Sequence, residues 1–240
     1  MKPIKIRMAI IFAVFLFKAI TSFGQKNEVN VNLYSGIFAF RGKGATINSS
    51  IDFNPYTSPS IYTTNPFGRK SKFSYAIEIH TQRILKNSNI IGVAIGYENG
   101  TSKVHIDTVT QNGFLVWVYA ANGKTTMKNT FIGLNPYFGH RYKIKNVTFD
   151  LLAGVDFAIH LKGKEIGYAI LNNNKEYEVS YESVFTKPFL DLRPRVEIKT
   201  TFTKISFLTG YSFGVTNYQT QNNKKVFSSI LRIGLGYQIK

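Results

Sequence analysis

Charged side chains of both signs alternate with apolar ones in the later part of the sequence. In "LDLRPRVEIK", residues 190–199, every odd-numbered position from 191 onward is charged, and positions 190, 192, 196 and 198 are apolar. A period of two places these two kinds of side chain on opposite faces of a β-strand. Acids and bases on one face can form ion pairs, or can pass protons or ions along a polar path. The same alternation places the following residues on polar strand faces: Glu78, Glu98, Arg141, Asp150, Asp156, Asp191, Arg193, Arg195, Glu197 and Arg232.

These charges are expected to neutralise one another, because isolated charges in a narrow interior would cost several kcal/mol of desolvation. A path for protons or ions is the alternative. The histidines add no catalytic or metal motif, since no pair has metal-ligand spacing and no H-E-x-x-H occurs. By parity His80 and His160 share the polar face, His140 lies on the apolar face near a short turn, and His105 lies in an outer extension. We therefore expect no metal, no cofactor and no enzymatic activity.

Eight segments alternate in this way, and each is expected to be a β-strand. They are 29–40, 73–84, 90–98, 130–142, 147–161, 190–199, 205–216 and 231–240. Short connections follow the second, fourth and sixth segments, whereas the first, third and fifth are followed by the long stretches 41–72, 99–129 and 162–189. Tight turns at one end, long loops at the other and an even number of strands are typical of an outer-membrane barrel.

The polar faces are rich in glycine and other small residues, which suits a narrow barrel interior better than an open wet surface. The apolar faces are then expected to touch lipid, where closure leaves no backbone group unpaired. The predicted fold is all-β: an eight-stranded antiparallel transmembrane β-barrel with short periplasmic turns and long extracellular loops, some extended as β-hairpins. A soluble barrel or sandwich is the alternative. Pro136 and Pro194 fall inside two strands, and we expect bulges to accommodate them.

The N-terminus predicts export. A basic segment precedes the apolar run Met8 to Phe17, and Ser22 and Gly24 supply the small residues of a cleavage site. Residues 1–24 are therefore expected to be a secretory signal peptide, and residues 25–240 the barrel. Four of the 30 Lys and Arg and none of the 13 Asp and Glu lie in residues 1–24, which leaves the rest with a net charge of +13. The chain has no cysteine, so no disulfide can form.

The long connections carry signals of their own. Turns are expected at Asn112-Gly113 and at residues 172–175, with the flanking strands continuing past the membrane. The first connection, rich in Pro, Asn, Ser and Tyr, is expected to lack regular structure. An apolar run with the single tryptophan spans residues 114–119, and a large exposed apolar patch usually marks an interaction surface. Its candidate partner-binding residues are Phe114, Val116, Trp117 and Tyr119; packing against neighbouring loops is the alternative.

Lysines gather at both ends of the predicted barrel. Those near the short turns include Lys86, Lys143 and Lys204, and those on the long-loop side include Lys72 and Lys128. Both sets would meet anionic headgroups, with lipopolysaccharide phosphates outside and acidic phospholipids inside. Solvated loop charge is the alternative, and a nucleic-acid partner is not expected.

The strands "IIGVAIGYENG", "FIGLNPYFGHRY" and "LRIGLGYQIK" combine glycine with aromatic residues. Together with the architecture, they resemble the small outer-membrane β-barrel family, the OmpA/OmpX-like transmembrane barrels described as porin-family or outer-membrane β-barrel proteins. The resemblance covers residues 25–240 and implies a multi-pass protein of the bacterial outer membrane.

Three functions follow from these observations as hypotheses. The first is a non-catalytic barrel with a side-chain-filled polar lumen, acting as an envelope component or as an accessory subunit of a larger secretion, uptake or assembly complex. Such a protein would contact outer-membrane lipids, including lipopolysaccharide, and other outer-membrane proteins through its extracellular loops. The second is a narrow porin-like transporter of small or hydrophobic solutes. The third is a barrel enzyme that modifies lipid A or phospholipid.

Overall fold

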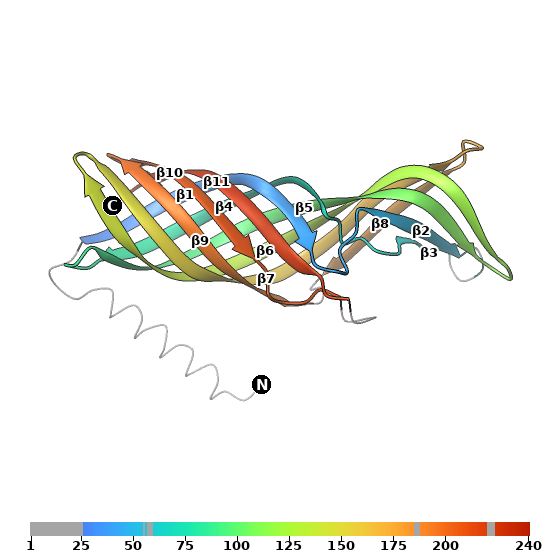
Figure 1. Ribbon diagram of the computed structural model, residues 1–240, viewed down its shortest axis with the longest axis horizontal. Helices are drawn as coiled ribbons and strands as arrows, with labels where there is room; N and C mark the ends of the chain where they lie inside the picture. Colours follow the sequence, from blue (N-terminus) through green and yellow to red (C-terminus); the bar gives the residue numbers. More distant parts are fainter. Residues whose placement is uncertain (1–25, 55, 57–59, 185–187, 220–223) are drawn as a thin grey trace, which may run out of the picture.

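The computed structural model describes residues 26–54, 56, 60–184, 188–219 and 224–240. The expected signal peptide lies outside these residues. Eleven strands form one sheet (Figure 1). Among the described residues no helix is long and apolar enough to cross a membrane.

Eight strands close into a ring, which confirms the predicted barrel. Each pairs antiparallel with its neighbours in the order β1, β4, β5, β6, β7, β9, β10, β11, and β11 pairs back with β1. Short connections and both ends of the described chain lie at one end of the barrel (Figure 1). The barrel strands are β1 (Lys26–Arg41), β4 (Lys70–Ile84), β5 (Asn89–Asn112), β6 (Val116–Ile144), β7 (Val147–Leu171), β9 (Leu190–Phe202), β10 (Ile205–Phe213) and β11 (Phe227–Gln238).

The two faces of the barrel differ in chemistry as the alternation predicts. On β10 the burial pattern alternates strictly, with Phe207 and Tyr211 exposed on the outside and Ser206 and Ser212 buried inside. Apolar side chains ring the outside of the other barrel strands in the same way. Exposed apolar residues of this number would be unfavourable in water, so the outer surface of the ring is suited to hydrocarbon.

Three strands continue well beyond the barrel and carry an extracellular extension. β5, β6 and β7 are 24, 29 and 25 residues long, and turns at Asn112-Gly113 and at residues 172–175 end them as predicted. Three shorter strands join them: β2 (Asn48–Asn54) pairs parallel with β5, β3 (Ser60–Thr63) pairs with β2, and β8 (Glu176–Val184) pairs with β7. The expectation that the first connection lacks regular structure is therefore wrong, because β5 extends far enough to offer β2 a free edge.

The chemistry of the two faces reverses where the strands leave the barrel. Along β5 the inward side chains change from Glu98 and Ser102 to the buried Val104, Ile106 and Val109. Eight buried apolar side chains fill the extension: Ile51, Val104, Ile106, Val109, Ala169, Leu171, Tyr177 and Val179. The extension thus has its own hydrophobic core, as a water-exposed sheet requires, while the barrel below it has a polar interior.

The prolines inside the strands are accommodated without bulges, contrary to expectation. Pro136 pairs with Val93 and Pro194 pairs with Val155, and neither register shifts at these positions. Between β6 and β7 the bridge pairing is interrupted at Asn135 and Pro136, but the same register resumes at Tyr137. The missing N–H of proline is tolerated here because a few backbone hydrogen bonds between the strands are simply not formed.

Close packing inside the barrel predicts a large difference between two glycines of the lumen. Gly92 pairs with Tyr137, and a Cβ on Gly92 would lie 2.4 Å from Cζ of that ring, whereas a Cβ on Gly133 would meet nothing within 4 Å. We expect Gly92→Ala to lower the free energy of unfolding by about 1–3 kcal/mol through overpacking. Gly133→Ala should leave it unchanged within about 0.5 kcal/mol. Urea unfolding in lipid vesicles measures both, and equal effects would contradict this packing.

Candidate functional site

Ion pairs fill the lumen from its periplasmic end. The Arg141 guanidinium donates to both Asp150 oxygens at 2.6 Å and to both Glu28 oxygens at 2.8 and 2.9 Å. Gln82 also donates to Glu28, at 2.8 Å, and accepts a hydrogen bond from Tyr137 at 3.1 Å. These side chains come from β1, β4, β6 and β7, so one arginine ties opposite parts of the wall together.

Arg195 forms the middle layer. Its guanidinium donates to both Glu78 oxygens, at 2.9 and 3.1 Å, and to Glu197 at 2.5 Å, with Asp156 Oδ1 at 3.4 Å. The Tyr34 hydroxyl donates to Glu197 at 3.1 Å, and the Tyr34 ring lies beneath the guanidinium, 5.3 Å from centroid to Cζ. The arginine and the three carboxylates around it are all buried.

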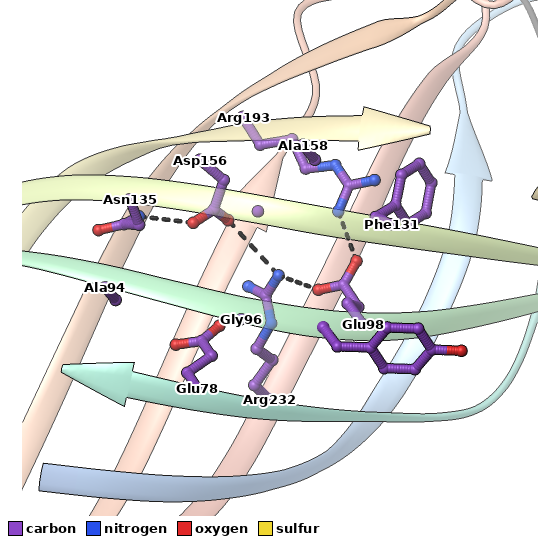
Figure 2. A pocket seen from close by; sticks show the side chains of 12 residues that line it. Glu78, Ala94, Gly96, Glu98, Phe131, Asn135, Asp156, Ala158, Arg193 and Arg232 are labelled. Carbon is purple, nitrogen blue, oxygen red and sulfur yellow. Dashed lines mark hydrogen bonds and ion pairs between the residues drawn. The ribbon is translucent and has the colours of Figure 1, made fainter. Parts of the chain in front are cut away.

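Arg232 and Arg193 form the upper layers (Figure 2). Arg232 bonds to Glu98 and approaches Asp156 at 3.4 Å, and Arg193 donates to Glu98 at 2.6 Å and to Asp191 at 2.7 Å. Glu98 therefore bridges two arginines that lie on separate strands. The sequence-predicted lumen residues are all brought together in these layers.

Little space remains between these side chains. One cavity of the lumen measures about 20 Å³ and is lined by residues such as Glu78, Asn135, Asp156 and Arg232 (Figure 2). A second cavity of about 10 Å³ lies beside His80 and Arg195. Such volumes hold a water molecule or so, and no larger solute.

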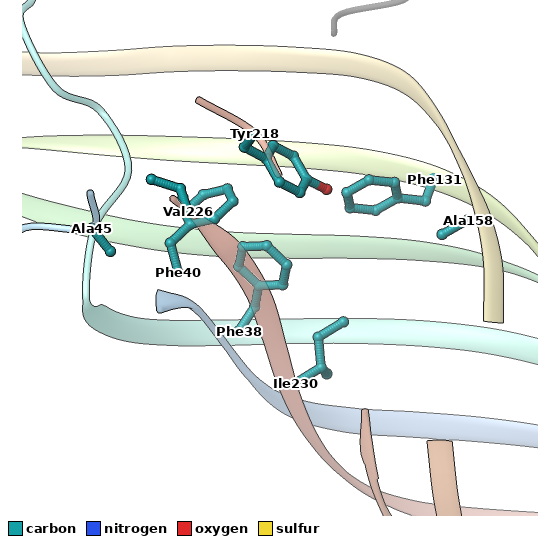
Figure 3. Packing of buried hydrophobic residues seen from close by; sticks show 8 residues of the cluster. All are labelled: Phe38, Phe40, Ala45, Phe131, Ala158, Tyr218, Val226 and Ile230. Carbon is teal, nitrogen blue, oxygen red and sulfur yellow. The ribbon is translucent and has the colours of Figure 1, made fainter. Parts of the chain in front are cut away.

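An apolar cluster closes the extracellular mouth of the lumen (Figure 3). Phe38, Phe40 and Phe131 project from the wall and are completely buried. Tyr218 and Val226, from the connection between β10 and β11, pack onto them, and the Tyr218 ring lies 5.0 Å from that of Phe40. The Tyr218 hydroxyl donates to Asp191 at 2.6 Å, so the cluster is joined to the topmost ion pair. We name this cluster, with Ala45, Ala158 and Ile230, the mouth plug.

The histidines occupy the places that parity predicts. His80 is buried in the lumen with Nε2 2.7 Å from Glu78 Oε2. His160 is buried beside the mouth plug and stacks on Phe131 at 4.8 Å. His140 lies near the short turns, with Nδ1 2.9 Å from Asn89 Oδ1. No group of three or more His, Cys, Asp and Glu side chains in the described ranges could hold a metal ion.

Sequence reasoning missed several members of the lumen. Glu28 is 2 % exposed and binds Arg141, yet it lies one residue before the predicted first strand. Glu28 lies at an even-numbered position, as do Asn30, Asn32 and Tyr34 on the polar face of the same strand. This parity was enough to predict that Glu28 faces the lumen. Tyr218 carried no signal, because its burial depends on how a connection folds back over the barrel.

The tip of the extension exposes a continuous apolar surface. Phe114 is 99 % exposed and Trp117 is 54 % exposed, and Leu115, Val116, Val118 and Tyr119 are exposed as well. We call residues 114–119 the apolar tip. Both faces of β6 are apolar here, whereas the opposite residues of β5, such as Thr110, Gln111 and Asn112, are polar. Among the described residues, the apolar tip is therefore exposed and not covered by neighbouring loops.

The carboxyl group of Glu165 is buried at the base of the extension. Glu165 points inward from β7 and accepts a hydrogen bond from the Thr63 backbone N–H at 3.2 Å. Burial raises the pKa of the Glu165 carboxyl, and the hydrogen bonds from Thr63 offset part of this rise.

Breaking the middle layer of the lumen should strongly destabilise the barrel. Arg195→Met leaves the buried Glu78, Glu197 and Asp156 without their shared cation, and we expect a loss of about 3–5 kcal/mol in the free energy of unfolding. The exposed pair Lys162–Glu182, 2.7 Å apart, provides the control, because Lys162→Met should cost less than about 1 kcal/mol. Urea unfolding in lipid vesicles measures both variants; similar losses would show that the buried layer is not structural.

Glu165 should make the stability of the extension depend on pH. Because its pKa is raised in the folded state, the folded extension binds this proton more tightly than the unfolded one. The stabilisation is complete below the ordinary pKa of a glutamate and is lost as the pH rises through the raised value. Hydrogen exchange of β3 and β7, corrected for intrinsic rates, should show protection falling with pH in the wild type but not in Glu165→Gln. Glu178→Gln, on the exposed face of β8, should behave as the wild type; an unchanged pH profile in Glu165→Gln would refute the assignment.

No protein-family model matches the chain, and no curated protein matches it. Among solved structures, the chain is similar to Ail, the attachment invasion locus protein of Yersinia pestis, in complex with the heparin analogue sucrose octasulfate. The identity is 10 % and the TM-score is 0.33, and the match covers 90 % of this chain and 100 % of Ail. Neisserial surface protein A gives 10 % identity and a TM-score of 0.34, with coverage of 87 % and 96 %.

The Pseudomonas putida toluene transporter TodX is also similar, at 7 % identity with a TM-score of 0.25, covering 91 % of this chain and 90 % of that one. Likenesses of this strength carry no inference about ligands or activity. The closed ring of strands, its apolar outer face and its polar, ion-paired interior establish the class from the chain itself. The protein is an eight-stranded β-barrel of the bacterial outer membrane.

Proposed function

We propose that this protein is a non-catalytic, non-conducting outer-membrane barrel that serves as an accessory subunit of a larger outer-membrane complex for secretion, uptake or assembly. The barrel anchors the extension, and the apolar tip binds the partner protein. The observation that carries this proposal is the exposure of the whole run from Phe114 to Tyr119 at the end of an extension that has its own core.

The extension is built to hold the apolar tip in a fixed position. Its core packs residues from β2, β5, β7 and β8, and the rings of Phe53 and Tyr177 meet at 5.4 Å. Fourteen residues of β6 separate Val116 from Thr130, where the strand leaves the barrel, and this corresponds to roughly 45 Å of strand. An apolar surface so far along the strand from the barrel is not expected to reach the bilayer, so its partner is expected to be a protein.

The composition of the apolar tip suits protein recognition. Trp, Tyr and Phe are the residues that most often carry binding energy at protein interfaces, because they bury a large area with few rotatable bonds. An apolar surface of this kind left in water would also promote aggregation. A partner protein that covers the apolar tip would explain why the chain carries it.

The filled lumen counts against the transport alternative. Four layers of ion pairs cross it, the two cavities between them have room for about a water molecule each, and the mouth plug closes the outer end. The enzymatic alternative needs a histidine that lipid can reach near the outer leaflet, whereas His160 is 1 % exposed and stacks on Phe131 inside the barrel. Planar-bilayer recording should accordingly show no single-channel conductance for the wild type.

Partners of two kinds follow from this proposal. Other outer-membrane proteins would bind at the apolar tip, and outer-membrane lipids, including lipopolysaccharide, would contact the barrel wall and the lysines at its outer end.

Loss of two anchor residues tests the role of the apolar tip. Phe114→Ser/Trp117→Ser should abolish the co-purification of a partner protein from source membranes in mild detergent, by at least about tenfold in quantitative mass spectrometry, because central aromatic residues dominate such interfaces. The barrel should remain folded, since both side chains are exposed.

The matched control is Ile47→Ser/Tyr62→Ser, which removes one aliphatic and one aromatic exposed side chain of the extension that do not belong to the apolar tip. It should retain the partner. Purified partner should then bind the wild type and not the tip variant. If every co-purifying protein is retained by the tip variant, the proposal is wrong.

A further inference from the structure

Four lysines converge on the outer face of the protein, just above the barrel. Lys124 and Lys128 lie two residues on either side of Thr126 in β6, so the three side chains share one face. Lys103 of β5 is the direct cross-strand partner of Thr126. Lys72 of β4 reaches the same point, where Nζ donates to Thr126 Oγ1 at 3.3 Å. Lys103, Lys124 and Lys128 are close enough to act electrostatically on Lys72, and Lys124 Nζ also lies over the Tyr168 ring, 5.5 Å from its centroid. We call these four residues the lysine cluster.

The lysine cluster forms no ion pair with the described residues. In the described part of the chain, no carboxylate lies within 4 Å of any of its four ammonium groups. The neighbouring lysines of β7 differ, because Glu182 pairs with Lys162 at 2.7 Å and with Lys164 at 3.9 Å. The pKa of Lys72, which lies outside the membrane-spanning segment, is lowered mainly by partial burial. The positive charges of Lys103, Lys124 and Lys128 lower it further. Four like charges held together without an acid are a ready site for an anion.

The height of the lysine cluster matches the lipid headgroups. Directly below it on the same outer face lie Phe73 and Tyr75 of β4 and Tyr97 of β5, all exposed. Aromatic side chains of this kind form the girdle at the interface of outer-membrane barrels. Asn99 and Thr130, hydrogen-bonded at 3.3 Å, lie along the strands between Tyr97 and the lysines of β5 and β6.

We propose that Lys72, Lys103, Lys124 and Lys128 form a binding site for the phosphate groups of an outer-leaflet glycolipid of the lipopolysaccharide type. The phosphate lies over Thr126, whose hydroxyl accepts from Lys72 and donates its own proton to a phosphate oxygen. The acyl chains of the lipid run down the wall past Phe73, Tyr75 and Tyr97.

A lipid-borne phosphate fits this site better than a free one. Exposed ammonium groups hold a soluble anion weakly, because salt screens them over about 8–10 Å. A phosphate attached to acyl chains is already concentrated at this height and adds contacts with the aromatic girdle. The site deepens the lipid contacts of the proposed function and does not depend on the apolar tip.

The test uses the folded full-length mature chain in detergent micelles, titrated with diphosphoryl lipid A and followed by native mass spectrometry. Each lysine near a membrane surface contributes about fivefold in affinity, so Lys72→Gln/Lys103→Gln/Lys124→Gln/Lys128→Gln should weaken binding by at least about a hundredfold. Single variants at Lys124 and Lys128, each about fivefold weaker, provide a second measurement if the quadruple variant is poorly folded. Lipid A stripped of its phosphates should bind the wild type as weakly as diphosphoryl lipid A binds the quadruple variant.

The control variant Lys86→Gln/Lys143→Gln/Lys204→Gln/Lys240→Gln removes the same charge from exposed lysines at the periplasmic end and should change the affinity less than about threefold. Equal loss in the control, or equal binding of dephosphorylated lipid, would overturn the proposal. Displacement of the lipid by inorganic phosphate at micromolar concentration would show a free-phosphate site instead. Phe114→Ser/Trp117→Ser should retain lipid binding, and the lysine variant should retain the partner protein, so the two proposals fail separately.

Discussion

Backbone N–H and C=O groups that cross hydrocarbon must find their partners inside the protein, since no water is available to them there. The pairing of β1 with β11 meets this requirement, because it closes the ring of barrel strands and leaves no free edge within it. With eight strands, closure also fixes a narrow interior that side chains can fill. The ion pairs of the lumen follow from that geometry: charges enclosed in so small a space must neutralise one another, and Arg141, Arg193, Arg195 and Arg232 each contact at least two carboxylates.

The same constraint explains why β5, β6 and β7 reverse the chemistry of their faces. Within the membrane the outer face must be apolar, and the interior can be polar. Above it, water surrounds the strands and the inner face must become apolar to hold the sheet together. The transition occurs over a few residues, from Glu98 to Val104 on β5. Lysines occupy the outer face where the interior becomes apolar, so the polarity of the strands itself marks the membrane boundary.

The barrel was predictable from sequence because its signal is local. Period-two alternation identified every barrel strand, and parity alone assigned Glu78, Asp156 and Arg195 to the interior. The extension was predicted only in part, since β2 and β3 owe their structure to the distant edge of β5 and not to a pattern of their own. The mouth plug was not predictable, because Tyr218 and Phe40 meet only after the ring has closed. The bulges predicted at Pro136 and Pro194 do not form, because neighbouring strands hold the register even where a backbone hydrogen bond is missing.

The continuity of β5, β6 and β7 has a mechanical consequence. These strands run from the periplasmic end to the extracellular tip as single pieces of backbone. A force on the turn at Asn112-Gly113 is therefore transmitted to the barrel along the β5–β6 and β6–β7 ladders, in which many hydrogen bonds share the load. The barrel and the extension are thus expected to move together as one stiff unit in the membrane.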